Sequence, residues 1–438
     1  MDYTASEVLQ FVEENDVGFV RLAFCDIFGN QKNISIMPDS LPRAFESGIG
    51  IDASAVPGFS EVTESDLLLF PDPATLAVLP WRPSHGRVVR FFCDVKRPDG
   101  TAFEGDGRGI LRRAVAEAAD MGYTCQIGPE CEFYLTERDE NGEPTLQPHD
   151  HAGYLDIAPL DKGENVRREI CLTLAEMGIR PESSHHEQGP GQNEIDFAYD
   201  DALRAADNLV TFKSVVKTIA ARNGLFASFM PKLYADRPGS GLHINLSLAK
   251  EGVNIFKTGT DEHSQAAESF IAGVLAHCRE ITVFCNPLTN SYARFGKLEA
   301  PEFVSWSHQN RSQLVRIPAA KGKYSRMEYR GADPSCNPYW AFALLIRAGL
   351  DGIRSGRKLG AACDLDLYTD GGKAAGIERL PEDLGEAIAL AKQSTLVAEC
   401  LPAKTLSRFF AVRQQEWDAY EHAENKEKFE RGRYFLRT

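Results

Sequence analysis

Acidic residues recur on short strand-like segments of this chain, and basic residues accompany them. The segments lie at residues 128–133, 185–194, 239–243 and 326–330. Residues two apart on a strand point to the same side, so Glu130 and Glu132 share one face and Glu328 and Arg330 share another. Carboxylates crowded on one face repel each other unless a cation lies between them. Oxygen-rich ligand sets with one imidazole suit Mg²⁺ or Mn²⁺, so the sequence predicts a metal cluster that handles phosphate.

Length and charge limit the alternatives. A chain of 438 residues is too long for one ordinary core, which predicts two domains or one large domain with an appendage. The net charge of −15 disfavours partnership with nucleic acid, which needs a basic face, and with an anionic membrane surface. Arginines inside a negatively charged protein remain compatible with binding small anions in a pocket.

The ten cysteines are scattered singly, and no two of them form a Cys-x-x-Cys pair. Many lie in apolar runs, where free thiols behave as small core residues. The first residues show no signal-peptide pattern, and no apolar run reaches membrane-spanning length. We therefore expect a reduced, cytoplasmic protein.

Two regions follow from the pattern of apolar residues. Residues 1–98 are predicted to be mostly strands, at 19–28, 33–37, 75–81 and 87–95, with a hairpin turn at Gly29 and Asn30. A turn at residues 98–101 marks the predicted boundary. Helices and strands then alternate, with helices predicted at 110–121, 166–177, 209–222, 262–284 and 339–353. Residues 371–376 are predicted to form a surface loop.

Each motif also has an ordinary structural interpretation. A Glu-x-Glu strand is usually two solvated side chains, adjacent histidines often lie in a surface loop, and Gly-Ser-Gly can simply begin a strand. The tight return at residues 189–193 could bring Glu194 beside Glu187. Arg294, Arg311, Arg316, Arg326 and Arg330 could be surface charges, but their clustering among Pro, Gly and aromatic residues also fits an anion cradle.

Taken together, the motifs resemble those of the glutamine synthetase family. The resemblance runs from Asp-Ile-Phe-Gly at 26 to Glu-Arg-Gly-Arg-Tyr at 430. Its strongest stretches are Gly-Pro-Glu-Cys-Glu-Phe at 128, His-His-Glu at 185 with Gly-Gln-Asn-Glu at 191, Gly-Ser-Gly-Leu-His at 239, Asn-Ser-Tyr-Ala-Arg at 290, Asn-Arg-Ser at 310 and Arg-Met-Glu-Tyr-Arg at 326. In size the chain is similar to the shorter bacterial and archaeal members of type I.

The resemblance implies an α+β fold with an N-terminal β-grasp domain over residues 1–98. Residues 99–438 would form a catalytic domain in which an antiparallel sheet makes a funnel surrounded by helices. It also implies a homo-oligomer of six-membered rings, usually stacked as a dodecamer. Each active site would lie between neighbours, because one subunit's N-terminal domain closes the next subunit's funnel.

The resemblance also implies roles for individual residues. The ligands of a metal that orders the amino-acid site would be Glu132, Glu187 and Glu194. The ligands of a second metal that holds ATP phosphates would be Glu130, His243 and Glu328. Substrate would be bound by Arg294, Gly239, Glu132, Tyr154 and Glu187. Nucleotide would be contacted by Ser247, Asn245, Arg316, Lys323 and Arg326, and the catalytic residues would be Asp52, Glu299, Arg311 and Arg330.

The implied reaction joins glutamate and ammonia at the expense of ATP. ATP would phosphorylate the glutamate side chain to γ-glutamyl phosphate, with Mg²⁺ or Mn²⁺, Arg311 and Arg330 offsetting the charge of the moving phosphoryl group. Asp52 with Glu187 would bind ammonium and remove its proton. The loop that carries Glu299 would keep water from the intermediate.

Several positions depart from the family pattern. Ala55 stands where a hydroxyl is expected, Pro238 replaces an asparagine, and Asn245 replaces a second histidine. The loop at 294–299 is one residue shorter than usual, and Glu61 is acidic where some members have a regulatory arginine.

Because these changes alter the walls of the substrate pockets, an alternative function remains: a γ-glutamyl-amine ligase that acts on a polyamine or ethanolamine. Retention of Asp52, Tyr154 and Glu187 favours ammonia instead. A non-catalytic structural member is a remote alternative, because such a protein is expected to lose metal carboxylates or phosphate arginines, and this chain keeps them.

Overall fold

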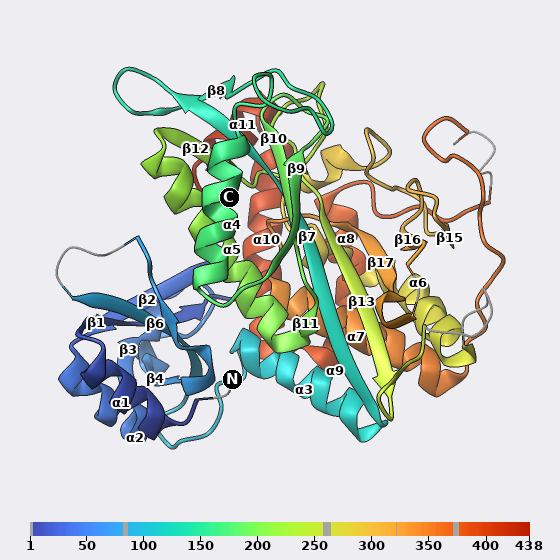
Figure 1. Ribbon diagram of the computed structural model, residues 1–438. Helices are drawn as coiled ribbons and strands as arrows, with labels where there is room; N and C mark the ends of the chain where they lie inside the picture. The colour runs from blue at the N-terminus through green and yellow to red at the C-terminus, as the bar shows by residue number, and fades with distance from the viewer. Residues whose placement is uncertain (1–2, 82–85, 257–263, 321, 371–375) are drawn as a thin grey trace.

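The computed structural model describes residues 3–81, 86–256, 264–320, 322–370 and 376–438. Two sheets with helices packed around them form the molecule, as Figure 1 shows. The smaller sheet lies at the N-terminal end, and the larger one crosses the middle of the structure. Of the predicted surface loop at 371–376, residues 371–375 lie outside the described residues.

The N-terminal sheet has the strand order β2-β1-β6-β4-β3, with β5 beside β6. Its strands are β1 (Val17–Cys25), β2 (Gln31–Ile36), β3 (Ile49–Asp52), β4 (Asp66–Pro71), β5 (Ala77–Val78) and β6 (Arg87–Lys96). The first and sixth are parallel, and the other pairs are antiparallel. The predicted hairpin between β1 and β2 is confirmed, and Gly29 supplies the left-handed backbone (φ +81°) that its turn requires.

The larger sheet has the order β15-β16-β17-β13-β7-β10-β9, and short strands extend it. Its strands are β7 (Tyr123–Arg138), β8 (Pro144–Pro148), β9 (Pro181–His186), β10 (Gln192–Phe197), β11 (Asp200–Asp201), β12 (Leu225–Ser228), β13 (Leu242–Lys250), β14 (Val253–Asn254), β15 (Trp306–His308), β16 (Val315–Ile317) and β17 (Met327–Ala332). All its pairs are antiparallel except β15 with β16. The long strand β7 pairs with both β10 and β13, so it fixes the positions of the others.

Helices cover one face of this sheet and form the C-terminal part of the molecule. They are α3 (Gly107–Asp120), α4 (Glu164–Glu176), α5 (Ala202–Arg222), α6 (Gln265–Cys285), α7 (Pro338–Ser355), α8 (Leu384–Gln393), α9 (Thr395–Cys400), α10 (Ala403–Glu421) and α11 (Lys426–Tyr434). Phe212 of α5 packs its ring against Phe133 of β7 at a centroid distance of 6.0 Å. Because Phe133 and Glu132 point to opposite sides of β7, α5 lies on the face opposite that of Glu132.

The predicted helices after residue 100 are confirmed, and α6 is described from residue 265, so residues 262–263 of that prediction lie outside the described part. Two expectations for the N-terminal region are wrong. Residues 75–81 form a short turn followed by the two-residue β5, because Pro73 begins a 3₁₀ turn there. The region is also not mainly strand, since α1 (Ala5–Glu14) and α2 (Leu41–Ser47) flank the sheet. Among the described residues, no helix is long and apolar enough to cross a membrane.

Candidate active site

Strand register brings the acidic residues of separate segments side by side. Glu194 of β10 lies directly opposite Glu132 of β7. His243 of β13 lies directly opposite Glu130 of β7 on its other edge. Side chains that are opposite across an antiparallel ladder project from the same face. The shared face predicted for Glu130 and Glu132 therefore also carries Glu194 and His243.

His243 is the centre of this group. Its Nδ1 lies 3.4 Å from Oε2 of Glu130, 4.0 Å from Oε1 of Glu194 and 3.9 Å from Oε1 of Glu328. Its Nε2 lies 3.9 Å from Oε1 of Glu132. One imidazole and four of the five predicted carboxylates thus meet on the sheet.

Glu187 joins the group through His185, which is not among the predicted site residues. His185 Nε2 lies 3.0 Å from Oε1 of Glu187 and 3.3 Å from Oε2 of Glu194. The adjacent His186 points the other way, toward Asp150 (Nε2 to Oδ1 2.9 Å), because successive strand residues alternate. All six predicted metal ligands therefore lie in one group of contacting side chains.

The electrostatics of the group are those of a cation site. Burial, with the charge of Glu132 next, raises the pKa of Glu194 well above its usual value. Burial also raises the pKa of Glu132. The donor atoms of Glu130, Glu194 and His243 lie within 4.8 Å of one another, as do those of His185, Glu187 and Glu194. Buried carboxylates at this spacing are stabilised by hard divalent cations, so the residues present fit Mg²⁺ or Mn²⁺.

Arginines lie directly beside the carboxylates. Burial opposes the charge of Glu328, but the neighbouring cations, Arg330 foremost, together lower the pKa of this carboxyl. Arg330 donates from Nη1 to Oε1 of Glu328 at 2.5 Å, and Arg316 donates to the other oxygen. Arg330 also donates from Nε to the carbonyl of Arg311 at 3.1 Å. The group can therefore hold cations on one side and anionic oxygens on the other.

These residues line a cavity of about 550 Å³. Of the predicted site residues, its lining holds Glu130, Glu132, Tyr154, Glu187, Glu194, His243, Glu299, Arg311, Arg316 and Arg326. Such a volume is within the range of about 300–1,000 Å³ typical of small-molecule sites.

A glycine-rich segment closes the deeper end of the site. A Cβ on Gly239 would lie 2.6 Å from Cγ of the buried Arg294, so this close approach requires glycine. Gly241 donates from its backbone nitrogen to Oε2 of Glu132 at 2.8 Å. Gln192, which is not among the predicted site residues, donates from Nε2 to the same oxygen at 3.1 Å and to the carbonyl of Gly239 at 3.0 Å.

The space beside Arg294 is nearly closed by the loop that carries Glu299. The cavity here measures about 20 Å³, and it is lined by Glu132, Glu187, Gln188, Gln192, Pro238, Gly239, Gly241, His243, Arg294, Leu298, Glu299 and Ala300. This is room for about one water molecule. Glu299 accepts a hydrogen bond from Nε2 of Gln188 at 2.8 Å. Leu298 and Glu299 both have left-handed backbones (φ +45° and +73°), a strained geometry for these residues that often accompanies function.

A second cavity of about 440 Å³ adjoins the first, because Glu130 and Arg326 line both. Of the predicted nucleotide residues, Asn245, Ser247, Lys323 and Arg326 line it, whereas Arg316 lines the first cavity. Asn245 accepts from Nε of Arg326 at 2.8 Å and donates to Oε1 of Glu130 at 2.7 Å. Asn245, which stands where the family pattern has a second histidine, thus links the two cavities.

Two tyrosines in this second cavity had no signal in the sequence. Tyr199 and Tyr324 lie edge to face with ring centroids 6.5 Å apart. They come from segments more than a hundred residues apart, so only the folded chain brings them together.

Asp52 is the one predicted catalytic residue that the chain does not bring to this site. It is exposed at the end of β3, where its Oδ1 accepts hydrogen bonds from the backbone nitrogen of Ser54 at 3.0 Å and from its hydroxyl at 2.6 Å. It is not among the described residues that line either cavity. Tyr154, in contrast, lies at the mouth of the first cavity, and its ring packs edge-on against His185 at 5.5 Å.

Comparison with known proteins agrees with this geometry. The profile described as "Glutamine synthetase, catalytic domain" matches residues 104–432, and "Glutamine synthetase, beta-Grasp domain" matches residues 16–98. A protein named glutamine synthetase from Clostridium saccharobutylicum is 46% identical over 95% of this chain and 96% of its own. One from Methanosarcina mazei is also 46% identical, over 95% of each chain.

Solved structures with the same fold match nearly the whole chain. A GmaS/ADP complex superposes with a TM-score of 0.88 at 31% identity, covering 99% of each chain. The predicted class, a β-grasp domain joined to this type of catalytic domain, is confirmed. The chain belongs to the glutamine synthetase family.

Proposed function

We propose that this protein is an ATP-dependent ligase that forms glutamine from glutamate and ammonia through γ-glutamyl phosphate. One observation carries the proposal: four carboxylates converge on His243 directly beside Arg316 and Arg330. Phosphoryl transfer to a carboxylate needs both cations that bridge phosphate oxygens and fixed positive charges beside them. The relatives named glutamine synthetase, 42–46% identical over 95% of the chain, support the same reaction.

The proposed cofactors are two or more Mg²⁺ or Mn²⁺ ions. Glu132, Glu187 and Glu194 would hold one ion. Glu130, His243 and Glu328 would hold another. When bound, such ions neutralise phosphate oxygens and act as Lewis acids toward the transferring group. His185 lies 3.0 Å from Glu187 and orients this carboxylate toward the site.

The arginines and the adjoining cavity would bind the nucleotide. Asn245, Ser247, Lys323 and Arg326 would contact ATP, with Tyr199 and Tyr324 beside the base. Arg311, Arg316 and Arg330 would lie at the phosphates, since they flank the carboxylates at the junction of the cavities. Loss of one such fixed donor costs about 3–4 kcal/mol of transition-state stabilisation.

Glutamate would bind against Arg294 and Gly239, under the loop that carries Glu299. The cavity beside Arg294 measures about 20 Å³, which is too small for an amino acid, so this loop must move to admit the substrate. Closure would then exclude water from the acyl phosphate, with Gln188 holding Glu299 in place through the hydrogen bond of 2.8 Å.

Ammonium would be bound and deprotonated by Asp52 of a neighbouring subunit together with Glu187 and Tyr154. The exposure of Asp52 and its absence from the described linings of its own chain's cavities support a homo-oligomer with sites between subunits, for which we propose rings stacked as a dodecamer. We also propose a β-grasp domain at residues 1–98, a catalytic domain at 99–438 and a cytoplasmic location. Profile matches to residues 16–98 and 104–432 support this division.

Ammonia is favoured over a larger amine as the acceptor. Pro238 contributes only its ring and a carbonyl that accepts from the hydroxyl of Tyr134 at 2.7 Å, so the altered wall adds no recognition group for a second amine. A direct test supplies ATP, Mg²⁺ and glutamate and compares phosphate release with ammonium, ethanolamine and putrescine. We expect turnover with ammonium to exceed that with either amine. Turnover with an amine alone would contradict the proposal.

A further inference from the structure

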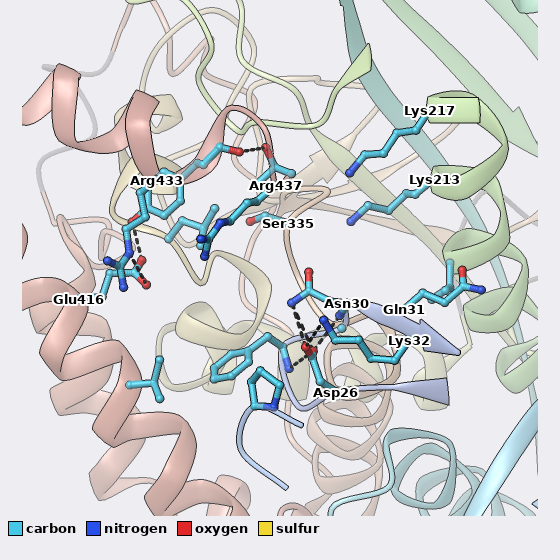
Figure 2. Close-up of a pocket in the computed structure, with 18 of the residues that line it drawn as sticks. Asp26, Asn30, Gln31, Lys32, Lys213, Lys217, Ser335, Glu416, Arg433 and Arg437 are labelled. Atoms are coloured by element: carbon cyan, nitrogen blue, oxygen red, sulfur yellow. Dashed lines mark hydrogen bonds and ion pairs between the residues drawn. The ribbon is translucent and has the colours of Figure 1, made fainter. Parts of the chain in front are cut away.

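A third cavity, of about 620 Å³, lies on the other side of the catalytic sheet, away from the proposed active site. Three segments that are distant in sequence enclose it: the turn between β1 and β2, helix α5, and the C-terminal helices α10 and α11 with the residues after them. Because α5 packs on the face opposite Glu132, the sheet separates this cavity from the carboxylates. Figure 2 shows Lys213 and Lys217 extending from α5 toward the segment that carries Arg433 and Arg437.

The lining is strongly basic, although the protein has a net charge of −15. Its cationic side chains are Lys32, Lys213, Lys217, Arg413, Arg433 and Arg437. Its anionic side chains are Asp26 and Glu416, and the lining also includes Thr438, the last residue of the sequence. The lining therefore carries an excess of positively charged side chains.

The two anionic side chains are already engaged. Asp26 is buried, accepts hydrogen bonds from the backbone nitrogens of Phe28 and Asn30 at 3.0 and 2.9 Å, and lies 3.5 Å from Nζ of Lys32. Glu416 lies 2.9 Å from Nη1 of Arg413 and 3.6 Å from Nε of Arg433. These carboxylates balance the cations of their own segments, and neither of them forms an ion pair with the lysines of α5 among the described residues.

Lys213, Lys217 and Arg437 are the cations that remain. In the part of the chain that the structure describes, no carboxylate forms an ion pair with any of the three. Lys213 donates to the carbonyl of Pro334 at 2.6 Å. Burial, with the charge of Lys213 next, lowers the pKa of Lys217 to about 7. Two lysines one turn apart on a helix repel each other unless an anion lies between them.

We propose that this cavity binds a small anion that carries two or more phosphate or carboxylate groups, held by Lys213, Lys217 and Arg437. A volume of about 620 Å³ is enough for such a molecule, since small-molecule sites measure about 300–1,000 Å³. Two lysines on one helix and an arginine from another segment of the same lining suit an anion with separate charged groups better than a single monovalent ion. The proposal is independent of the proposed activity, because none of these three residues lines the active-site cavities.

Isothermal titration of the full-length protein tests the proposal, in a buffer of chloride and Tris without divalent metal. Inorganic diphosphate and citrate are the two probes, so that phosphate and carboxylate sources are distinguished, and acetate is the monovalent control. We expect saturable binding of at least one probe and no saturable binding of acetate. Absence of saturable binding by both probes would overturn the proposal.

Substitutions locate the binding within the molecule. Lys217→Met is expected to weaken binding of the probe at least tenfold, and Lys217→Arg, which keeps the charge, is expected to retain it. Arg222→Met is the matched control, because Arg222 is exposed at the end of the same helix and does not line the cavity. Binding that is equal in wild type and Lys217→Met, with both proteins folded by circular dichroism, would place the anion elsewhere and overturn the proposal.

Discussion

Opposite faces of one sheet carry cavities of opposite charge, and the two are built differently. On one face, Glu130, Glu132 and Glu194 project from paired strands, so backbone register sets the spacing of their carboxylates. On the other face, Lys213 and Lys217 project from a helix toward C-terminal side chains contributed by separate helices. Strand pairing holds ligands to the precision that metal coordination requires, whereas charge attraction to an anion tolerates looser placement.

The largest effect is expected on the acidic face. Glu132→Gln removes a charge from the group but keeps its shape, so phosphate release should fall about 10²–10³-fold. Manganese binding, measured by electron paramagnetic resonance, should weaken in the same variant. Glu140→Gln is the control, because Glu140 is exposed in the loop after the same strand. Normal manganese binding and turnover by Glu132→Gln would contradict the proposal that this face of the sheet holds a metal site.

The second-largest effect concerns Asp52, which lines neither of the two active-site cavities in its own chain. Asp52→Asn should lower turnover with ammonium on the order of 100-fold, because a proton acceptor is lost. If a neighbour supplies Asp52, mixed oligomers of Asp52→Asn and Glu132→Gln subunits contain sites in which both residues are intact. Random mixing in equal amounts should restore about one quarter of the wild-type activity. Mixed oligomers no more active than the single variants would show that each site is built within one subunit.

The smallest effect is expected on the basic face and concerns stability. Lys217 has its pKa lowered to about 7 by burial and by Lys213, whereas the unfolded chain holds this proton up to about pH 10. Between these values the unfolded state binds more protons, so stability rises with pH. Relative to Lys217→Met, which lacks the group, wild type should gain about 2–3 kcal/mol between pH 7 and 9.

Thermal unfolding of both proteins at several pH values measures this difference. The charged groups that share the cavity with Lys217 are Asp26, Lys32, Lys213, Arg413, Glu416, Arg433 and Arg437. They are the same in both proteins, so their titration largely cancels in the comparison. A gap between wild type and Lys217→Met that stays constant from pH 7 to 9 would mean that Lys217 is not desolvated.

The same contrast explains how much could be predicted from sequence. The acidic site could be predicted because its ligands lie in short strand segments where alternate residues share a face, such as Glu130 and Glu132. The family resemblance gave the order of these segments. The pairing of β9 with β10 followed from the short return at residues 189–193, which was expected to bring Glu194 beside Glu187. The helix α1 was missed, although Thr4 and Glu7 form a capping box that a search for Thr-x-x-Glu would find.

The remaining features depend on long-range packing. Lys32, Lys217 and Arg437 have no common motif, and only the folded chain gathers them. Tyr199 with Tyr324 and Gln192 with Gly239 are likewise contacts across the fold. At residues 75–81 the error is the reverse, because the β-rich composition predicts a full strand. The turn that Pro73 begins leaves only the two-residue strand β5 there.

The central claim is that Glu130, Glu132, Glu187, Glu194, His243 and Glu328 together hold divalent cations. Anomalous diffraction at the manganese edge, from crystals of the assembled protein soaked in Mn²⁺, tests it most directly. The account predicts separate peaks within coordination distance of Glu132, Glu187 and Glu194 and of Glu130, His243 and Glu328. Crystals in which Mn²⁺ peaks occur only elsewhere, with this face free of metal, would contradict it.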